Sequence, residues 1–246
     1  MTKINLKNSN IYAKTEDSIA GMGEDIVIKK MLSEMQISTG WVVDVGSWDG
    51  WHLSNVGLLL QEGFGGILIE VDGQRVERSK ERWSNRNDII HHQKLVDLEE
   101  NTLDRVFAES ETPIDFDVLN IDIDSYEFWI WKSVSYKPKI VCIEHNGNII
   151  DVDATIPYLD NWKYNSSTDN YGSSAQALYR LAIHKGYALV SASRHNLIFC
   201  DTKYSHLFET FDQIDASWFK SVLGINPHQG RIRMPDSYFV FNPEVE

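Results

Sequence analysis

The sequence has 246 residues, with 23 Lys and Arg against 36 Asp and Glu, which gives a formal net charge of −13. A hydrophobic content of 42% and a charged content of 24% are those of an ordinary globular protein, so a disordered chain is excluded. The acidic balance disfavours nonspecific binding to nucleic acid or to an anionic membrane, because both would repel such a surface. We therefore expect no nucleic-acid partner.

No apolar run approaches the ~18 residues of a membrane span, and the first residues lack the apolar stretch of a signal peptide. Cys142 and Cys200 each lie inside an apolar run. This pattern predicts buried free thiols rather than a disulfide framework or a zinc site. We expect a cytoplasmic protein with no membrane span, and the sequence leaves open whether it forms a homo-oligomer.

Short β-rich apolar runs alternate with helical patterns, which predicts parallel βαβ units and a sheet covered by helices on both faces. In chain order, the expected elements are a helix over 24–35, a strand over 41–45, a helix over 53–62, a strand over 66–70, a helix over 75–83, a strand over 89–91, a helix over 103–108, a strand over 116–121, a helix over 126–134 and a strand over 140–144.

The C-terminal part of the chain has a different pattern. Residues 146–171 are long, polar and irregular, which is typical of a functional lid or binding loop. The spacing of Ser173 and Gln176 is that of a capping box and predicts a helix that ends at Lys185 and Gly186. Apolar runs over 188–192 and 197–200 lie too close together for a parallel crossover, so they predict an antiparallel hairpin. Residues 238–241 are a candidate edge strand.

We expect a single domain over residues 1–246, with an N-terminal helical segment (1–39), a Rossmann-like core (40–201) and a C-terminal extension (202–246). Five parallel strands followed by an antiparallel hairpin are the order expected for a class I S-adenosylmethionine methyltransferase. The predicted fold class is therefore α/β and Rossmann-like, with a mostly parallel seven-stranded sheet, a C-terminal antiparallel hairpin and helices on both faces. A dinucleotide dehydrogenase would continue with parallel units.

Residues 44–50 form the first candidate motif, directly after the first strand. Gly46 would let backbone amides approach a ligand closely, and the next helix presents free N–H groups. Trp48 holds the middle position, so the Gly-x-Gly-x-x-Gly dinucleotide pattern is not met. Asp44 suits a ligand that carries an ammonium group better than a pyrophosphate. A plain strand-to-helix turn is the alternative interpretation.

Glu70 is the last residue of the second expected strand. In a doubly wound sheet, an acid at this position accepts hydrogen bonds from ribose hydroxyls, and it follows the glycine turn by about 20 residues. Glu70 also follows Gly46 at close to that spacing. Together the two motifs favour a nucleoside-bearing cofactor over a solvated strand-end carboxylate.

Acidic residues also follow the fourth and fifth expected strands. Asp122 and Asp124 end the fourth strand, and Glu144 and His145 end the fifth, at the sheet edge where open α/β sheets bind ligands. Converging carboxylates must be paired, protonated or bound to a cation. Asp122, Glu144 and His145 would suit Mg²⁺ or Mn²⁺. Alternatively, His145 is the general base and Asp122 caps the helix that begins at Ser125.

The sequence resembles the FkbM-type methyltransferases, a branch of the class I S-adenosylmethionine-dependent enzymes that methylate hydroxyl groups of sugars and polyketide natural products. The resemblance runs from about Gly23 to Asp201. It rests on a series of motifs in the family's order: Gly23-Glu24-Asp25, residues 43–50 followed by Leu53-Ser54-Asn55, residues 65–70, residues 102–104, residues 114–124 and residues 138–144. Trp48 stands where the family has a small polar residue.

The resemblance implies that S-adenosyl-L-methionine is the methyl donor and that the acceptor is a hydroxyl of a sugar or small secondary metabolite. Its site residues fall into three groups. Cofactor binding would use Asp44, Gly46, Ser47, Glu70 and Asp122; catalysis would use His145 and Asp124; and Asp122, Glu144 and His145 are the candidate ligands of a metal ion.

Two other functions are compatible with the fold. One is a noncatalytic Rossmann-like binding or scaffold protein. The other is an NAD-linked oxidoreductase, which the missing glycine pattern disfavours. Four aromatic residues of the long loop, Tyr158, Trp162, Tyr164 and Tyr171, would suit a carbohydrate-like acceptor if they are exposed.

Overall fold

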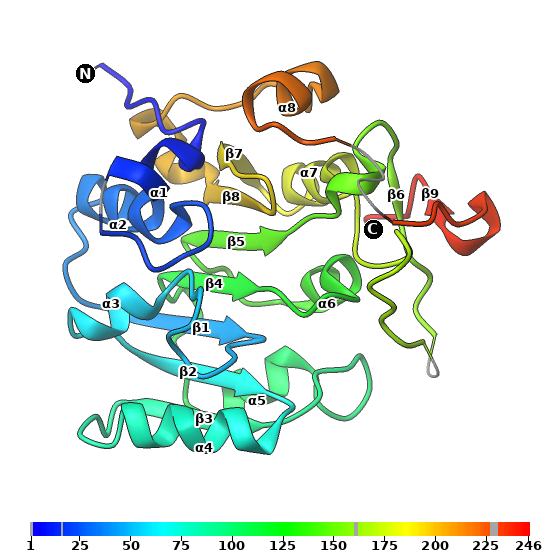
Figure 1. Cartoon of the computed structure of the whole chain (residues 1–246). Coiled ribbons are helices and arrows are strands. Elements are labelled where there is room, and N and C mark those ends of the chain that lie inside the picture. Colours follow the sequence, from blue (N-terminus) through cyan, green and yellow to red (C-terminus); the bar gives the residue numbers. More distant parts are fainter. Residues whose placement is uncertain (1, 16, 160–161, 227–230) are drawn as a thin grey trace.

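The computed structural model describes residues 2–15, 17–159, 162–226 and 231–246. Within these residues one seven-stranded sheet has the strand order β3-β2-β1-β4-β5-β8-β7 (Figure 1). Its strands are β1 (Trp41–Val45), β2 (Gly65–Glu70), β3 (Ile89–Gln93), β4 (Val118–Ile121), β5 (Ile140–Glu144), β7 (Tyr187–Ala192) and β8 (Asn196–Asp201).

The first five strands of this sheet run parallel to one another, and β8 is antiparallel to both β5 and β7. The predicted α/β fold class, with its mostly parallel sheet and C-terminal antiparallel hairpin, is therefore confirmed. Parallel pairing also brings the carboxyl ends of β1, β2, β4 and β5 to one edge of the sheet, where ligands bind in folds of this type.

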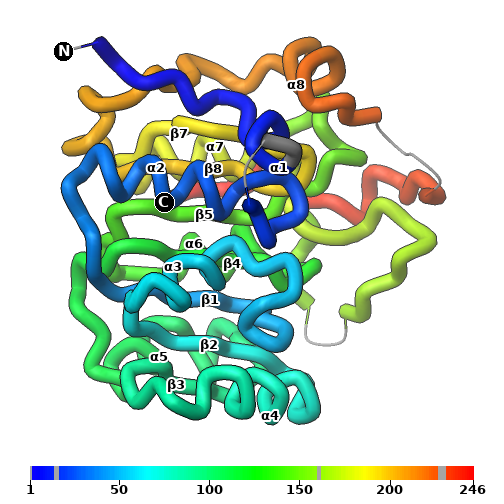
Figure 2. Tube along the Cα trace, turned by 60° about the vertical axis from the view of Figure 1, so that its left-hand side comes forward, coloured from blue at the N-terminus to red at the C-terminus, as the bar shows by residue number. Residues whose placement is uncertain are grey.

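Eight α-helices are described. They are α1 (Tyr12–Thr15), α2 (Glu24–Glu34), α3 (Gly57–Gln61), α4 (Gly73–Arg82), α5 (Leu103–Glu109), α6 (Glu127–Ser133), α7 (Ala175–His184) and α8 (Ala216–Val222). Figure 2 shows the sheet from a second direction, with α2 and α3 lying over its central strands.

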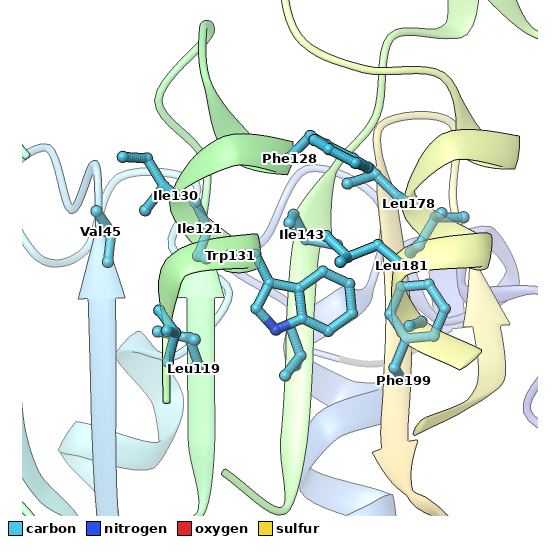
Figure 3. Close-up of a cluster of buried hydrophobic side chains, with 14 of the residues drawn as sticks. Val45, Leu119, Ile121, Phe128, Ile130, Trp131, Ile143, Leu178, Leu181 and Phe199 are labelled. Carbon is cyan, nitrogen blue, oxygen red and sulfur yellow. The ribbon is translucent and has the colours of Figure 1, made fainter. Parts of the chain in front are cut away.

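Alternate residues of the strands face two separate cores, because successive side chains of a strand point to opposite faces. On one face, the strands pack against buried side chains of α5, α6 and α7, including Trp131 and Leu178. Trp131 lies 5.4 Å, between ring centroids, from Phe199 of β8 (Figure 3). On the other face, the strands pack against α2 and α3, including Met31 and Leu59.

The prediction of a helix from residue 53 is wrong at its start, because α3 begins only at Gly57. Leu53 has a left-handed φ of 55°, and the Ser54 hydroxyl accepts hydrogen bonds from the backbone N–H groups of Val56 and Gly57 at 3.3 and 3.0 Å. These local bonds compete with a helix and delay it by one turn.

The capping residue of α7 also differs from the prediction. Ser174, not Ser173, is the N-cap, and its hydroxyl accepts from the backbone N–H of Ala177. The Ser173 hydroxyl instead pairs with the Thr155 hydroxyl at 2.7 Å. Ser173 therefore helps to fix the long loop rather than the helix.

The long loop contains β6 (Ala154–Thr155), which pairs with β9 (Val240–Phe241) near the C-terminus. The prediction of a further edge strand over 238–241 is therefore wrong about its place, since β9 belongs to a separate two-stranded sheet. Residues 160–161 of the predicted loop, and residues 227–230 of the predicted extension, lie outside the described residues.

Both cysteines are free and buried, as predicted. Cys142 of β5 and Cys200 of β8 lie on neighbouring strands, and burial raises the pKa of both thiols, that of Cys200 to about 12. In the described part of the chain, no helix is long and apolar enough to cross a membrane.

Candidate functional site

A cavity of about 900 Å³ opens at the carboxyl edge of β1, β2, β4 and β5. It is lined by seven of the eight residues that the sequence proposes for the site, namely Asp44, Gly46, Ser47, Glu70, Asp122, Asp124 and Glu144. The topology thus brings these strand-end residues together, whereas His145 does not line the cavity.

Asp44 is buried at the end of β1 and is held by polar side chains. Its Oδ1 accepts from Asn120 Nδ2 at 2.7 Å, and its Oδ2 accepts from Ser54 Oγ at 3.2 Å. Asn55 Nδ2 in turn donates to Asn120 Oδ1 at 2.9 Å. Burial raises the pKa of Asp44 to about 6, although the two hydrogen bonds to the carboxylate oppose the shift. A cationic group in the cavity would favour its charged form.

Gly46 begins a tight loop that no larger residue could form. Its φ is 85°, and a Cβ at this position would lie 1.8 Å from the backbone oxygen of Asp122. The backbone N–H groups of Gly46 and Ser47 both donate to the Ile69 oxygen, at 2.9 and 3.0 Å. The loop therefore lies close against the ends of β2 and β4. The cavity at the edge of the sheet is left open beside it.

Glu70 is a buried carboxylate at the end of β2. Its Oε1 accepts from the backbone N–H groups of Val71 and Asp72 at 2.8 and 2.9 Å, and its Oε2 accepts from that of Trp48 at 3.1 Å. Arg75 of α4 lies 3.6 Å from Oε2. The side chain is thus fixed in orientation before any ligand arrives.

Carboxyl groups crowd the far end of the cavity. Burial, together with the neighbouring carboxylates, raises the pKa values of Asp122 and Glu144, and burial raises that of the adjacent Glu127. Asp124 is exposed to the cavity at a left-handed φ of 57°, and the surrounding wall raises its pKa as well. Within the described residues, Glu144 Oε2 has no hydrogen-bond partner. Carboxyl groups with raised pKa values in a cavity are candidates for exchanging protons with a ligand.

His145 lies away from the cavity. It is 1% exposed, its ring packs 5.7 Å from that of Phe219, and its Nε2 lies 3.3 Å from the Ser193 carbonyl oxygen. Burial lowers its pKa to about 4, so the ring is neutral at physiological pH. Glu144, the last residue of β5, therefore lines the cavity, whereas His145, the next residue, packs into the core.

The predicted Mg²⁺ or Mn²⁺ ligands are Asp122, Glu144 and His145. Asp122 and Glu144 line the cavity, whereas His145 is buried beside Phe219, so the structure does not bring the three side chains together. Among the described residues, no group of three or more His, Cys, Asp or Glu side chains is arranged to hold a metal ion.

Three aromatic side chains, Tyr126, Tyr158 and Trp162, line the cavity, with Tyr126 centred 4.7 Å from Tyr158 and 5.4 Å from Trp162. Of the four loop aromatics singled out from the sequence, Tyr158 and Trp162 are therefore at the cavity, and Tyr164 and Tyr171 are not among its lining residues. Tyr171 is buried against Tyr164. Within the described part of the chain, the Trp162 Nε1 donor has no hydrogen-bond partner.

Sequence reasoning missed several residues of the site. Asn120 and Asn55 were not singled out, although they hold Asp44; an Asn inside the apolar run of β4 was the available signal. The sequence marks Trp48 as an interruption of a glycine pattern and as a departure from the resembled family, but it assigns the residue no role in the site. Arg75 was not singled out, although its guanidinium carbon lies 3.3 Å from the Trp48 ring centroid.

The sequence matches no protein-family model and no curated protein. Among solved structures, the chain is similar to a S-adenosylmethionine-dependent methyltransferase from Clostridium acetobutylicum, with 9% identity over 72% of this chain and 89% of that one and a TM-score of 0.43. It is also similar to a TehB-like S-adenosylmethionine-dependent methyltransferase from Corynebacterium glutamicum, with 11% identity over 78% and 92% of the two chains and a TM-score of 0.42.

A third similar structure is M. capricolum TrmK with its cofactor product S-adenosylhomocysteine, with 11% identity over 70% of this chain and 67% of that one and a TM-score of 0.41. These likenesses are too weak to carry a conclusion about activity. The strand order and the antiparallel hairpin of this chain define a class I methyltransferase fold of the Rossmann-like type.

The close approach of Gly46 to Asp122 yields the first prediction. Gly46→Ala should destabilise the fold by more than the ~1–2 kcal/mol of a left-handed alanine, because the new Cβ would also collide with a backbone oxygen. Gly224→Ala is the matched control, since Gly224 has a φ of 67° and open space around it. Urea unfolding would measure both variants, and equal losses of stability would contradict the collision.

Proposed function

We propose that the protein is a S-adenosylmethionine-dependent methyltransferase that transfers a methyl group to a hydroxyl of a sugar or small secondary metabolite, as the FkbM-type resemblance implies. The observation that carries the proposal is the placement of Asp44, Gly46 and Glu70 at the ends of two adjacent strands, around one cavity. Gly46 lines this cavity without a side chain of its own, and Glu70 would accept hydrogen bonds from ribose hydroxyls.

The cofactor, when bound, supplies a methyl group on a positively charged sulfur. Asp44, Gly46 and Ser47 would hold its methionine part, with the Asp44 carboxylate near the ammonium group. Glu70 would accept from the ribose. Asp122 would lie between the two ends of the cavity, where its carbonyl oxygen already contacts the Gly46 loop. In this proposal, positioning supplies much of the catalysis.

The acceptor end suits a polyhydroxylated ring. Tyr126, Tyr158 and Trp162 offer aromatic faces, Trp162 Nε1 offers an unused donor, and Glu144 Oε2 offers an unused acceptor. A sugar hydroxyl both donates and accepts, so this set of groups matches its needs. The excess of carboxylates over cations at this end also argues against a nucleic-acid acceptor, whose phosphates would be repelled.

Asp124 is our candidate for the general base. It lines the cavity and is exposed, unlike Asp44, Glu70, Asp122 and Glu144, and burial by the cavity wall raises its pKa. His145, the other catalytic residue that the sequence suggests, would have to leave the core to reach an acceptor. We therefore assign it no contact with the substrate.

The function is tested first by cofactor binding. Calorimetry should show that the wild-type protein binds S-adenosylhomocysteine and not NAD. Glu70→Ala should weaken binding roughly ten- to a hundredfold, the worth of a charge-assisted hydrogen bond of ~1.5–3 kcal/mol. Wild-type protein that binds neither compound would support a scaffold role, and binding of NAD alone would support an oxidoreductase.

The base is tested by comparing two variants. With a sugar acceptor identified by screening, Asp124→Asn should slow methyl transfer by ~10²–10⁴-fold while S-adenosylhomocysteine affinity is kept. His145→Ala should lower the melting temperature, because it opens a cavity beside Phe219, and should change the rate of methyl transfer little. The reverse pattern, a large rate loss in His145→Ala alone, would assign the base to His145.

The raised pKa of Asp44 predicts a pH dependence. In the free protein this carboxyl has a pKa of about 6 against 3.8 for an unburied one, so its contribution to stability is full below 3.8 and is lost as the pH rises through 6. A ligand ammonium favours the carboxylate. Hence S-adenosylhomocysteine should bind roughly tenfold more weakly at pH 5 than at pH 7. Asp44→Asn should remove this dependence, and an unchanged slope in that variant would contradict the assignment.

A further inference from the structure

Trp48 is an unexpected residue at its position in the loop of residues 44–50, which follows β1. Its φ of 51° lies in the left-handed region that favours glycine, and its indole is 41% exposed. Because the Trp48 ring is so exposed, burial adds little to its stability. Packing into the core therefore does not explain why a Trp stands at this position. An observed backbone outlier beside a binding cavity points to a role in that cavity.

The indole carries the guanidinium of Arg75. The Arg75 carbon Cζ lies 3.3 Å from the Trp48 ring centroid, and Nη1 lies 3.6 Å from Glu70 Oε2. Nε is 4.0 Å from an oxygen of Asp72. Trp48, Glu70 and Arg75 all line the cavity. The guanidinium is thus placed over the Trp48 ring, close to the carboxylates of Glu70 and Asp72, at the wall of the cavity.

The hydrogen bonds of Glu70 show what this arrangement is for. A carboxylate has about four lone-pair sites. Two on Oε1 are taken by Val71 and Asp72, and one on Oε2 is taken by Trp48, all through backbone N–H groups. One site remains, next to Arg75. A ribose presents two neighbouring hydroxyls, so Glu70 can accept from one and lacks a free site for the other.

We propose that Arg75, positioned by the Trp48 indole, is the second ribose-binding residue and donates a hydrogen bond to the hydroxyl that Glu70 cannot accept from. This assignment rests on the proposed cofactor. It gives the Arg75 donors a partner of the right kind, since a hydroxyl oxygen accepts while its proton turns elsewhere. Trp48 acts through Arg75 and is a positioning residue.

The molecule contains a matched control. Arg82 lies 5.1 Å from the Trp51 ring centroid, on the same helix as Arg75, but neither residue of this second pair lines the cavity. If the Trp48–Arg75 stack were only a surface contact, Arg75→Gln and Arg82→Gln would behave alike.

Calorimetry with S-adenosylhomocysteine tests the assignment. Arg75→Gln should weaken binding roughly ten- to a hundredfold, and Arg82→Gln should leave it unchanged. Trp48→Gly should also weaken binding, although glycine suits the left-handed backbone and should keep or raise the melting temperature. Weakened binding without loss of stability separates positioning from misfolding.

Analogues of S-adenosylhomocysteine that lack the 2′- or the 3′-hydroxyl identify the contact. For the wild type, removal of either hydroxyl should weaken binding, and in Arg75→Gln one of the two losses should disappear. Wild-type binding with an unaffected Arg75→Gln variant would overturn this assignment and leave the proposed function intact. A wild type that does not bind S-adenosylhomocysteine would overturn both.

Discussion

Burial of the Asp44 carboxylate at the end of β1 is the constraint on which the site depends. A buried carboxyl is costly unless its oxygens are hydrogen-bonded. Here Asn120, the residue opposite Asp44 in the β1–β4 register, donates to one oxygen, and Ser54 donates to the other. Asn55 fixes Asn120 in turn. These bonds tie two strands and the loop before α3 into one unit.

That unit determines the shape of the cavity. With Ser54 and Asn55 directed inward, the chain cannot begin a helix at Leu53, so the first turn stays open toward the sheet edge. The Gly46 loop is then pressed against the Asp122 carbonyl without room for a Cβ. The polar side chains that stabilise Asp44 therefore also help to keep the cavity beside it open.

The sheet and its binding edge could be predicted from sequence, because buried parallel strands are continuous apolar runs and their carboxyl ends must share one edge. The face on which each strand-end residue lies could not. Glu144 ends β5 and His145 follows it directly, yet one lines the cavity and the other packs against Phe219. A shift of one residue in a strand exchanges the two faces of the sheet. The sequence does not indicate at which residue the alternation of side chains between these faces ends.

Hydrogen bonds between residues far apart in the sequence could not be predicted either. The Gly23-Glu24-Asp25 motif is similar to a family signature, and it makes one local and one distant set of contacts. Asp25 accepts from the nearby backbone N–H groups of Ile19 and Ala20, whereas Glu24 accepts from Asn196 of β8. Spacing along the chain does not encode a contact that spans most of the sequence. Only the folded topology brings such residues together.

The two ends of the cavity are built by different means. The end at Asp44 and Glu70, where we propose that the cofactor binds, consists of strand termini, which the sheet holds rigidly. Tyr158 and Trp162 stand on the long loop, which is anchored to the end of β5 by Asn146, whose Nδ2 donates to the backbone oxygens of Asp169 and Tyr171 at 2.8 Å each. Asp169 also bonds the C-terminal segment, through the backbone oxygen of Ile232 and the N–H of Met234. Changes in that segment can thus reshape the aromatic end without disturbing Asp44 or Glu70, so under the proposed function one fold could keep its cofactor and exchange its acceptor.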